Sequence, residues 1–137
     1  MSEGSVVLIL SRVNTSSTTP SSTRRLTCTW VGDSDTGVVP SMTTTEEMDK
    51  VLSGKKLVMG ITVPDNNTAP SDLYRVSLVD ENGLDVLGGY FDGLSSTESE
   101  QLEPSIKNRI IDGPLTLSIS DNSVGGGGGV VKFYFTS

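Results

Sequence analysis

The residue types that most often perform chemistry in proteins are scarce in this sequence. It contains no histidine, and Cys28 is its only cysteine. Histidine is the usual general base beside a nucleophilic serine and a common metal ligand, so its absence removes both of these roles. Cys28 alternates with Leu26 and Trp30, a spacing that predicts a buried strand position rather than a nucleophile. We therefore predict no catalytic residue and no enzymatic activity.

Two acidic loops raise the question of a metal site. Residues 33–37 read Asp-Ser-Asp-Thr-Gly, like the opening of a calcium-binding loop, but Thr44 stands where such a loop needs a bidentate glutamate. Residues 80–85 place three acidic side chains around one turn. Because Asp and Asn side chains also accept hydrogen bonds from nearby backbone N–H groups in ordinary turns, we predict turns here, with no metal and no cofactor.

A glycine run and two basic pairs are the remaining local signals. Gly125 to Gly129 could suggest a phosphate-binding loop, but the lysine, the hydroxyl residue and the helix of such a loop are missing. We therefore predict a flexible hairpin tip that joins strands at 115–120 and 130–135. The pairs Arg24-Arg25 and Lys55-Lys56 could contact an acidic partner or protect a strand edge from aggregation.

Composition limits the classes of protein that remain. The chain has 137 residues, a net charge of −7 and no long block of one sign. An acidic balance argues against nucleic acid as a partner, since duplex binding needs clustered Lys and Arg. The apolar run at 6–10 is too short to span a membrane and follows an acidic residue, so we predict neither a targeting segment nor a membrane partner.

The spacing of apolar residues predicts an all-β fold. Short alternating segments separated by turn residues indicate a single β-sandwich over residues 1–137, for which a jelly roll is one possible form, with at most one short helix near 43–53. The main strands are expected at 5–13, 24–31, 56–63, 73–80, 115–120 and 130–135. Shorter strands are expected at 37–42, where a hairpin partner could begin, and at 84–87 and 105–111, with 88–103 as a loop or one helical turn.

The first apolar segment is the candidate for contact with a partner. Every residue from 6 to 10 is Val, Leu or Ile. Because successive side chains of a strand point to opposite faces, this strand is apolar on both faces. An N-terminal strand or arm of about residues 1–13 could therefore pair with a neighbouring chain. The predicted contact residues are Val6, Val7, Leu8, Ile9 and Leu10.

The second half of the chain resembles a group of small structural proteins of tailed bacteriophages. The resemblance rests on Asp-Glu-Asn-Gly-Leu-Asp-Val-Leu-Gly-Gly at 80–89, preceded by an alternating strand, and on Asp-Gly-Pro-Leu-Thr-Leu at 112–117, followed by the glycine run and a terminal strand. It covers roughly residues 56–135 and departs from the group's pattern in the long glycine run and the polar stretch 95–103.

This resemblance implies a component of the phage particle with a β-sandwich fold and no enzymatic activity. The favoured function is capsid decoration, in which the protein acts as cement on the head shell. Its partner would then be the major capsid protein or another virion protein, its location the virion, and its form a homo-oligomer, with a trimer favoured. Two alternatives stay open: a neck, connector, tail or fibre-base component, and a carbohydrate-binding surface module.

Overall fold

The computed structural model describes residues 3–13, 23–105 and 109–137, and it contains eight strands and one helix. In chain order these elements are β1 (Ser5–Arg12), β2 (Arg24–Val31), β3 (Met42–Thr43), α1 (Glu46–Leu52), β4 (Lys56–Pro64), β5 (Arg75–Val79), β6 (Glu100–Leu102), β7 (Thr116–Ser120) and β8 (Gly128–Thr136).

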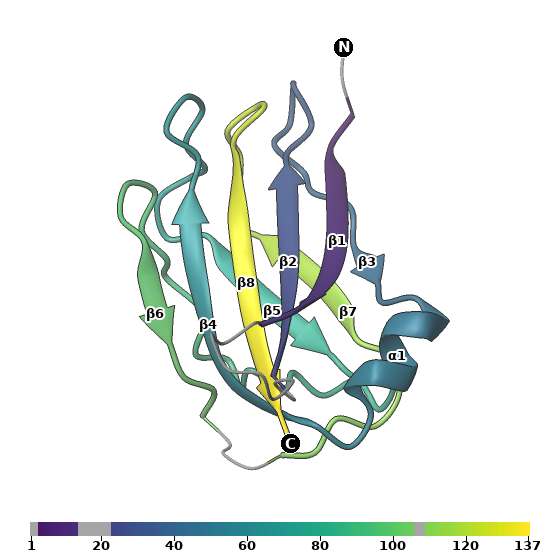
Figure 1. Ribbon diagram of the computed structural model, residues 1–137. Helices are drawn as coiled ribbons and strands as arrows, with labels where there is room; N and C mark the ends of the chain where they lie inside the picture. Colours follow the sequence, from purple (N-terminus) through teal and green to yellow (C-terminus); the bar gives the residue numbers. More distant parts are fainter. Residues whose placement is uncertain (1–2, 14–22, 106–108) are drawn as a thin grey trace.

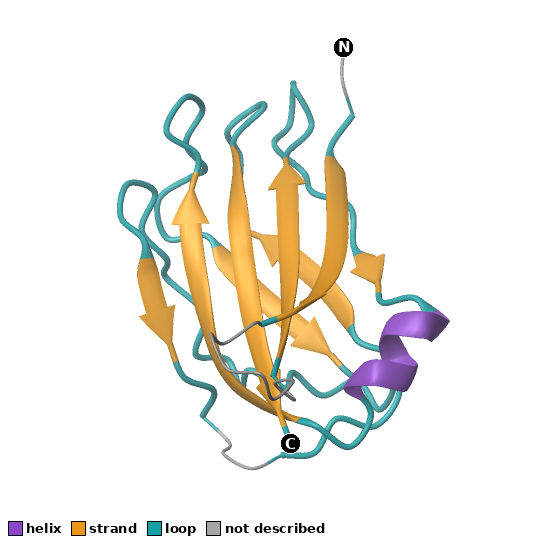
Figure 2. Cartoon of the chain, viewed as in Figure 1, coloured by secondary structure: helices purple, strands orange, loops and turns teal. Residues whose placement is uncertain are grey.

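The strands form two antiparallel sheets that face each other (Figures 1 and 2). One sheet has the order β1-β2-β8-β4-β6, and the other has the order β3-β7-β5. Figure 1 shows the three-stranded sheet behind the five-stranded one, with its strands crossing those of the front layer at an angle. The prediction of an all-β sandwich with one short helix is confirmed.

From β2 onward, successive strands alternate between the two sheets. Strands β2, β4, β6 and β8 belong to the five-stranded sheet, whereas β3, β5 and β7 belong to the other. This alternation is typical of a jelly roll, in which most connections cross from one layer to the other. The predicted hairpin between the last two strands is therefore wrong, because β7 and β8 lie in different sheets. Each strand has one buried side, and the two buried sides meet across the core rather than side by side.

The glycine run belongs to the connection that leads from β7 in one sheet to β8 in the other. It is not the tip of a hairpin. Gly126 donates its backbone N–H to the oxygen of Asp33, at 3.2 Å, and Gly128 donates to that of Thr68, at 3.1 Å. The last two glycines of the run are the first two residues of β8. A side chain at Gly125 would place its Cβ 2.1 Å from the carbonyl oxygen of Ser34. The run is therefore glycine because backbones approach each other closely here.

Three shorter predictions also need correction. Met42 and Thr43 pair with β7 rather than continuing from β2, because the turn at 33–37 sends the chain to the other sheet. Residues 84–87 form only a bridge, between Asp85 and Val79, and the stretch 88–103 contains a strand, β6. In the predicted strand 105–111, Ile110 forms an isolated bridge, and residues 106–108 lie outside the described part of the chain.

Helix α1 lies within the predicted range 43–53, and its ends are set by neighbouring residues. The Thr45 side-chain oxygen caps the helix by accepting a hydrogen bond from the backbone nitrogen of Met48, at 3.2 Å. Glu46 and Glu47 occupy the first turn, where their charges favour the positive end of the helix dipole. Gly54 follows with a φ of 84°, the left-handed conformation in which glycine stops a helix without strain.

The core lies between the two sheets and is held by aromatic contacts across it. The rings of Trp30 on β2 and Tyr74 have centroids 5.4 Å apart, and those of Phe133 on β8 and Phe91 are 6.0 Å apart. Phe91 is joined to the three-stranded sheet because its carbonyl oxygen accepts the N–H of Val76 on β5. All four rings are fully buried, and burial of one such ring contributes about 1.5–3 kcal/mol. These contacts fix how one sheet lies over the other.

Candidate docking surface

The side of the five-stranded sheet that points away from the core is a broad and partly exposed surface. Successive side chains of a strand point to opposite sides, so the residues that alternate with the buried ones share this surface. Strand pairing arranges them in three rows: Val7–Thr29–Val130–Val63, Ile9–Thr27–Lys132–Ile61–Gln101 and Ser11–Arg25–Tyr134–Met59. We call these thirteen residues the outer face.

More than half of the outer face is apolar. Val7 is 52% exposed and Ile9 is 57% exposed, whereas Val63 and Val130 are half-buried by their neighbours on the sheet. The charged residues among the thirteen are both cations, one of which is Lys132 near the centre. An exposed apolar surface with few charges is typical of a site where one protein contacts another.

The five predicted contact residues divide between the two sides of β1. Val7 and Ile9 belong to the outer face, whereas Val6 is buried and Leu8 and Leu10 are half-buried against the core. The strand is therefore apolar on both sides because it contributes to the core and to the outer face at once. Its backbone pairs with β2 along its whole length, and β1 forms the edge of the sheet.

Most of the outer face is not among the predicted contact residues. It includes Ile61 and Val63 on β4, and Val130 and Tyr134 on β8. The signal was present, since residues 57–63 and 130–135 contain apolar residues on both sides of their alternation. Such runs indicate strands that are covered on both sides, and here one side is left uncovered by the described residues.

The outer face is hollowed at the end where β2 and β4 finish. A hollow of about 400 Å³ is lined there by Val31, Val63, Val130 and the polar loop 65–67. The apolar floor and the polar rim could accept a protruding side chain of a partner, in the manner of a pocket at the centre of an interface.

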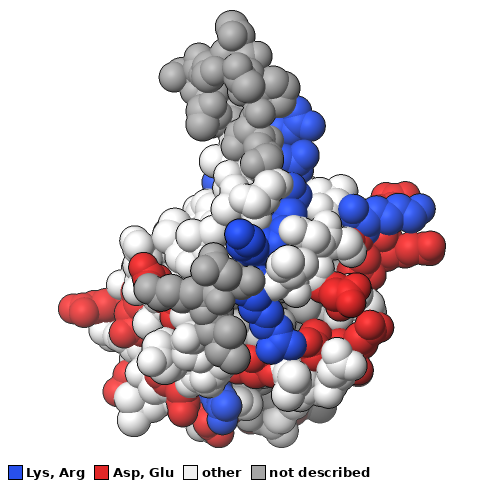
Figure 3. All heavy atoms as spheres, turned by 90° about the horizontal axis from the view of Figure 1, so that it is seen from below, with Lys and Arg blue, Asp and Glu red and all other residues white. Residues whose placement is uncertain are grey.

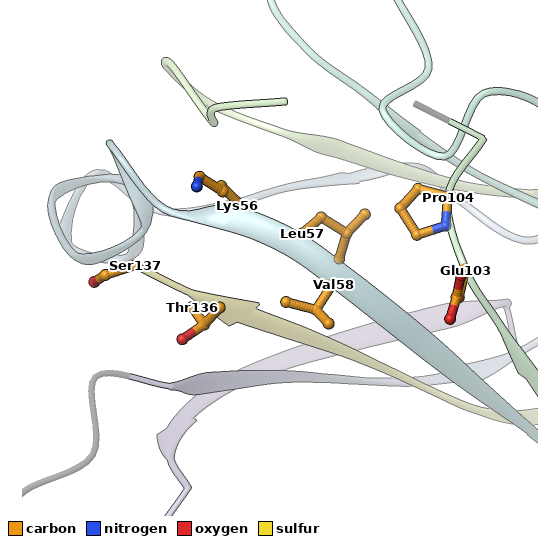
Figure 4. A pocket seen from close by; sticks show the side chains of 7 residues that line it. All are labelled: Lys56, Leu57, Val58, Glu103, Pro104, Thr136 and Ser137. Atoms are coloured by element: carbon orange, nitrogen blue, oxygen red, sulfur yellow. The ribbon is translucent and has the colours of Figure 1, made fainter. Parts of the chain in front are cut away.

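A second hollow, of about 310 Å³, lies at the other end of β4. Figure 4 shows Lys56 and Glu103 on opposite sides of it, with Leu57 and Val58 between them. A catalytic site needs polar groups that converge on one reacting atom. The arrangement of Lys56 and Glu103 offers no such convergence, and it fits a shallow contact surface better.

The structure brings both basic pairs to this same end of the five-stranded sheet. Arg24 on β2 pairs with Arg12 on β1 and with Phe135 on β8. Lys56 on β4 pairs with Thr136, which follows Phe135 on β8. Figure 3, which views this end directly, shows basic side chains in a band with acidic ones on both flanks. The pairs are thirty residues apart in sequence, so only the pairing of β2 and β4 with β8 explains why they meet.

The two acidic loops are built around backbone hydrogen bonds. The Oδ1 atom of Asp33 accepts the N–H groups of Asp35, at 2.8 Å, and Thr36, at 3.1 Å, and these bonds lower the pKa of Asp33. The Oδ1 atom of Asp80 accepts those of Asn82 and Leu84, at 2.9 and 3.1 Å. No group of three acidic or thiol side chains within residues 3–13, 23–105 and 109–137 is arranged to hold a metal ion.

Asp85 explains the second half of the 80–89 motif. Its Oδ1 atom accepts the N–H groups of Leu78 and Leu87, both at 3.0 Å, and its Oδ2 atom accepts that of Gly89, also at 3.0 Å. One carboxylate therefore ties the end of β5 to the chain that follows the turn. The 80–89 motif therefore forms a turn and specifies local structure rather than a site.

Cys28 lies on the core side of β2 and is fully buried. Burial raises the pKa of its thiol to about 12, because a thiolate would lose its hydration there. The reactive thiolate form is therefore rare at neutral pH.

Comparisons with protein-family models, with curated proteins and with solved structures found no match to this chain. In the described part of the chain, no helix has both the length and the apolar character needed to cross a membrane.

Proposed function

We propose that this protein is a non-enzymatic structural component of a bacteriophage particle that decorates the capsid and docks on it through the outer face. The observation that carries the docking role is the apolar outer face with its cationic centre. The particle context comes from the sequence resemblance over residues 56–135. The jelly-roll fold supports that context by analogy only, because this fold serves viral capsid domains and lectins alike.

The proposed action is thermodynamic. A protein that binds the assembled shell, and not its free subunits, stabilises the assembled state by mass action. From the strand spacing and rise, the outer face measures roughly 450 Å² over β1, β2, β8 and β4. A standard interface buries about 800 Å² on each partner, so one face alone supports a weak contact. Such a protein would act as a homo-oligomer on the virion, with the major capsid protein or another virion protein as its partner.

A carbohydrate-binding function is less well supported. Such modules stack sugar rings on exposed aromatic side chains, but Trp30 and Tyr74 are fully buried and paired with each other in the core. Tyr90 is 61% exposed, but it lies after the 80–89 turn, away from the half-buried Tyr134 of the outer face.

The copy number in purified particles, measured by quantitative mass spectrometry, tests the proposal. Decoration of a symmetric shell predicts on the order of hundreds of copies per particle. About six or twelve copies would place the protein at the neck or tail instead. Absence from the particle would overturn both assignments.

A variant pair tests the docking surface itself. Val63→Asp places a carboxylate on the outer face opposite the uncharged Val130 and should abolish binding to particles, because burying an unpaired charge at an interface is costly. Leu84→Asp makes the same chemical change at a turn residue that is 54% exposed, and it should leave binding intact. Equal binding by both variants, with folding checked by circular dichroism, would exclude the outer face as the docking surface.

A further inference from the structure

The free edge of β1 lacks the features that normally prevent strands from pairing between molecules. Natural edge strands are short, or they carry charges, proline or a bulge. β1 has eight residues, its register with β2 is unbroken, and it contains no proline and no charge before Arg12. The edges formed by β6 and β3 are only three and two residues long. The five-residue edge of β5 is covered, because Val76 donates its N–H to Phe91 and Leu78 donates to Asp85. Among the described edges, that of β1 is thus the long, unprotected one.

We propose that β1 pairs in antiparallel fashion with β1 of a second copy, about a two-fold axis at Leu8. The two five-stranded sheets then form one continuous sheet. This pairing makes the homo-oligomer of the proposed function a dimer, in place of the trimer favoured from the sequence, and it rests on that function only for the use made of the combined surface.

The charges at the two ends of β1 favour the antiparallel direction. Glu3 precedes the strand, Arg12 ends it, and both side chains are exposed. Antiparallel pairing brings Arg12 opposite Gly4 of the second copy and next to that copy's Glu3, so unlike charges meet at both ends. A parallel pair would instead place Arg12 beside the second copy's Arg12. Like charges placed opposite each other destabilise strand pairs.

The apolar positions are also self-complementary about Leu8. Val7 lies opposite Ile9 of the second copy, and the converse pair lies on the other side of the axis. Both pairs point to the outer face, where these side chains are exposed in one copy. Cross-strand pairs of β-branched residues are favourable contacts in sheets. The pairing therefore places the exposed apolar side chains of β1 beside their own counterparts on one continuous outer face.

The space beside β1 can accept a second strand. A hollow of about 260 Å³ lies between Leu10 and helix α1, where it is lined by Met48 and Val51 together with the polar Thr45 and Glu47. In the proposed register, Val6 of the second copy lies opposite Leu10 and next to this hollow. An added strand would thus meet a hollow whose lining is part apolar and part polar.

The size of the combined surface favours a second copy over a different protein at this edge. Two outer faces side by side give a surface of roughly 900 Å², against roughly 450 Å² for one copy. The larger area matches the contribution of one partner to a standard interface. Pairing through β1 therefore turns a surface suited to weak contact into one of ordinary interface size, and it leaves the outer face free.

Sedimentation velocity measures dimerisation of the purified protein at concentrations up to about 100 µM. The pairing is tested with the wild type, two double variants and one single variant. The wild type should form dimers. Val7→Lys with Ile9→Lys should weaken dimerisation at least ten-fold, because each lysine then faces a lysine. Val7→Lys with Ile9→Glu should restore it, since the register places each lysine opposite a glutamate. Val58→Lys, at a residue of β4 that is 47% exposed, is the control and should dimerise like the wild type.

Several results would overturn the inference: a monomeric wild type, a trimer, a double-lysine variant that dimerises normally, or a Lys/Glu variant as weak as the double-lysine one. Circular dichroism of each variant establishes that it is folded. The outcome is independent of the particle assay. A monomer that is abundant on particles would leave the proposed function intact and refute the pairing, whereas a dimer absent from particles would do the reverse.

Discussion

Replacement of Asp85 by alanine removes the acceptor of three backbone N–H groups, those of Leu78, Leu87 and Gly89. A polar group left without a partner costs about 1–3 kcal/mol, and the lower value applies because Asp85 is half-buried and water can reach part of the site. The expected loss of unfolding free energy is therefore about 3 kcal/mol. Asp85→Asn keeps the oxygen that serves Leu78 and Leu87 but turns its amide toward Gly89, so the expected loss is about 1 kcal/mol.

Urea unfolding followed by tryptophan fluorescence measures these losses, because Trp30 is the only tryptophan and is fully buried. With a slope of about 1.5 kcal/mol per molar urea, the alanine variant should unfold at about 2 M less urea than the wild type. Asp92→Ala is the control, since the Asp92 side chain is exposed and accepts only the N–H of Gly93. An alanine variant at 85 as stable as this control, or equal losses for alanine and asparagine at 85, would refute the role given to the carboxylate.

Two further substitutions test the packing and the electrostatics. Gly60→Ala should lower stability by about 2 kcal/mol and the Tm by several degrees, because its Cβ would lie 2.4 Å from the buried ring of Phe91. Adding Phe91→Leu should recover part of that loss in a calorimetric scan, and full additivity of the two losses would contradict the packing argument. The N–H groups of Leu84 and Asn82, together with Arg109, hold the pKa of Asp80 below its usual 3.8. The stabilisation that ionised Asp80 provides is thus complete above about pH 4 and is lost as the pH falls through the lowered pKa. Asp80→Asn should therefore weaken the dependence of the unfolding free energy on pH on the acid side. An unchanged pH dependence would refute this.

Local signals in the sequence predicted local structure well. The alternation of Leu26, Cys28 and Trp30 gives β2 its bounds and its buried side. Thr45 and Gly54 mark the ends of α1, because capping and the left-handed glycine depend only on neighbouring residues. The prediction of an all-β sandwich follows from the same local patterns.

The sheet to which a strand belongs is not a local property, and this is where the sequence analysis was wrong. β7 and β8 have the same alternation whether they pair with each other or face each other across the core. The connection of seven residues between them fits either arrangement. Strand β6 was missed because its three residues are polar or half-buried, and it is held by pairing with residues 60–62 of β4. The outer face could not be assembled without these pairings, since its rows combine residues from five strands.

The last strand of the chain is the central strand of the larger sheet, and β2 and β4 are joined only through it. During synthesis on the ribosome, the first hundred or so residues can therefore form no more than the β1–β2 and β4–β6 pairs. The two halves of the sheet combine only when residues 128–136 have emerged, and such long-range pairing makes folding slow. Until then the apolar sides of β2 and β4 stay exposed, so the nascent chain is a natural client for a chaperone, and a chain truncated before β8 should aggregate rather than fold in part.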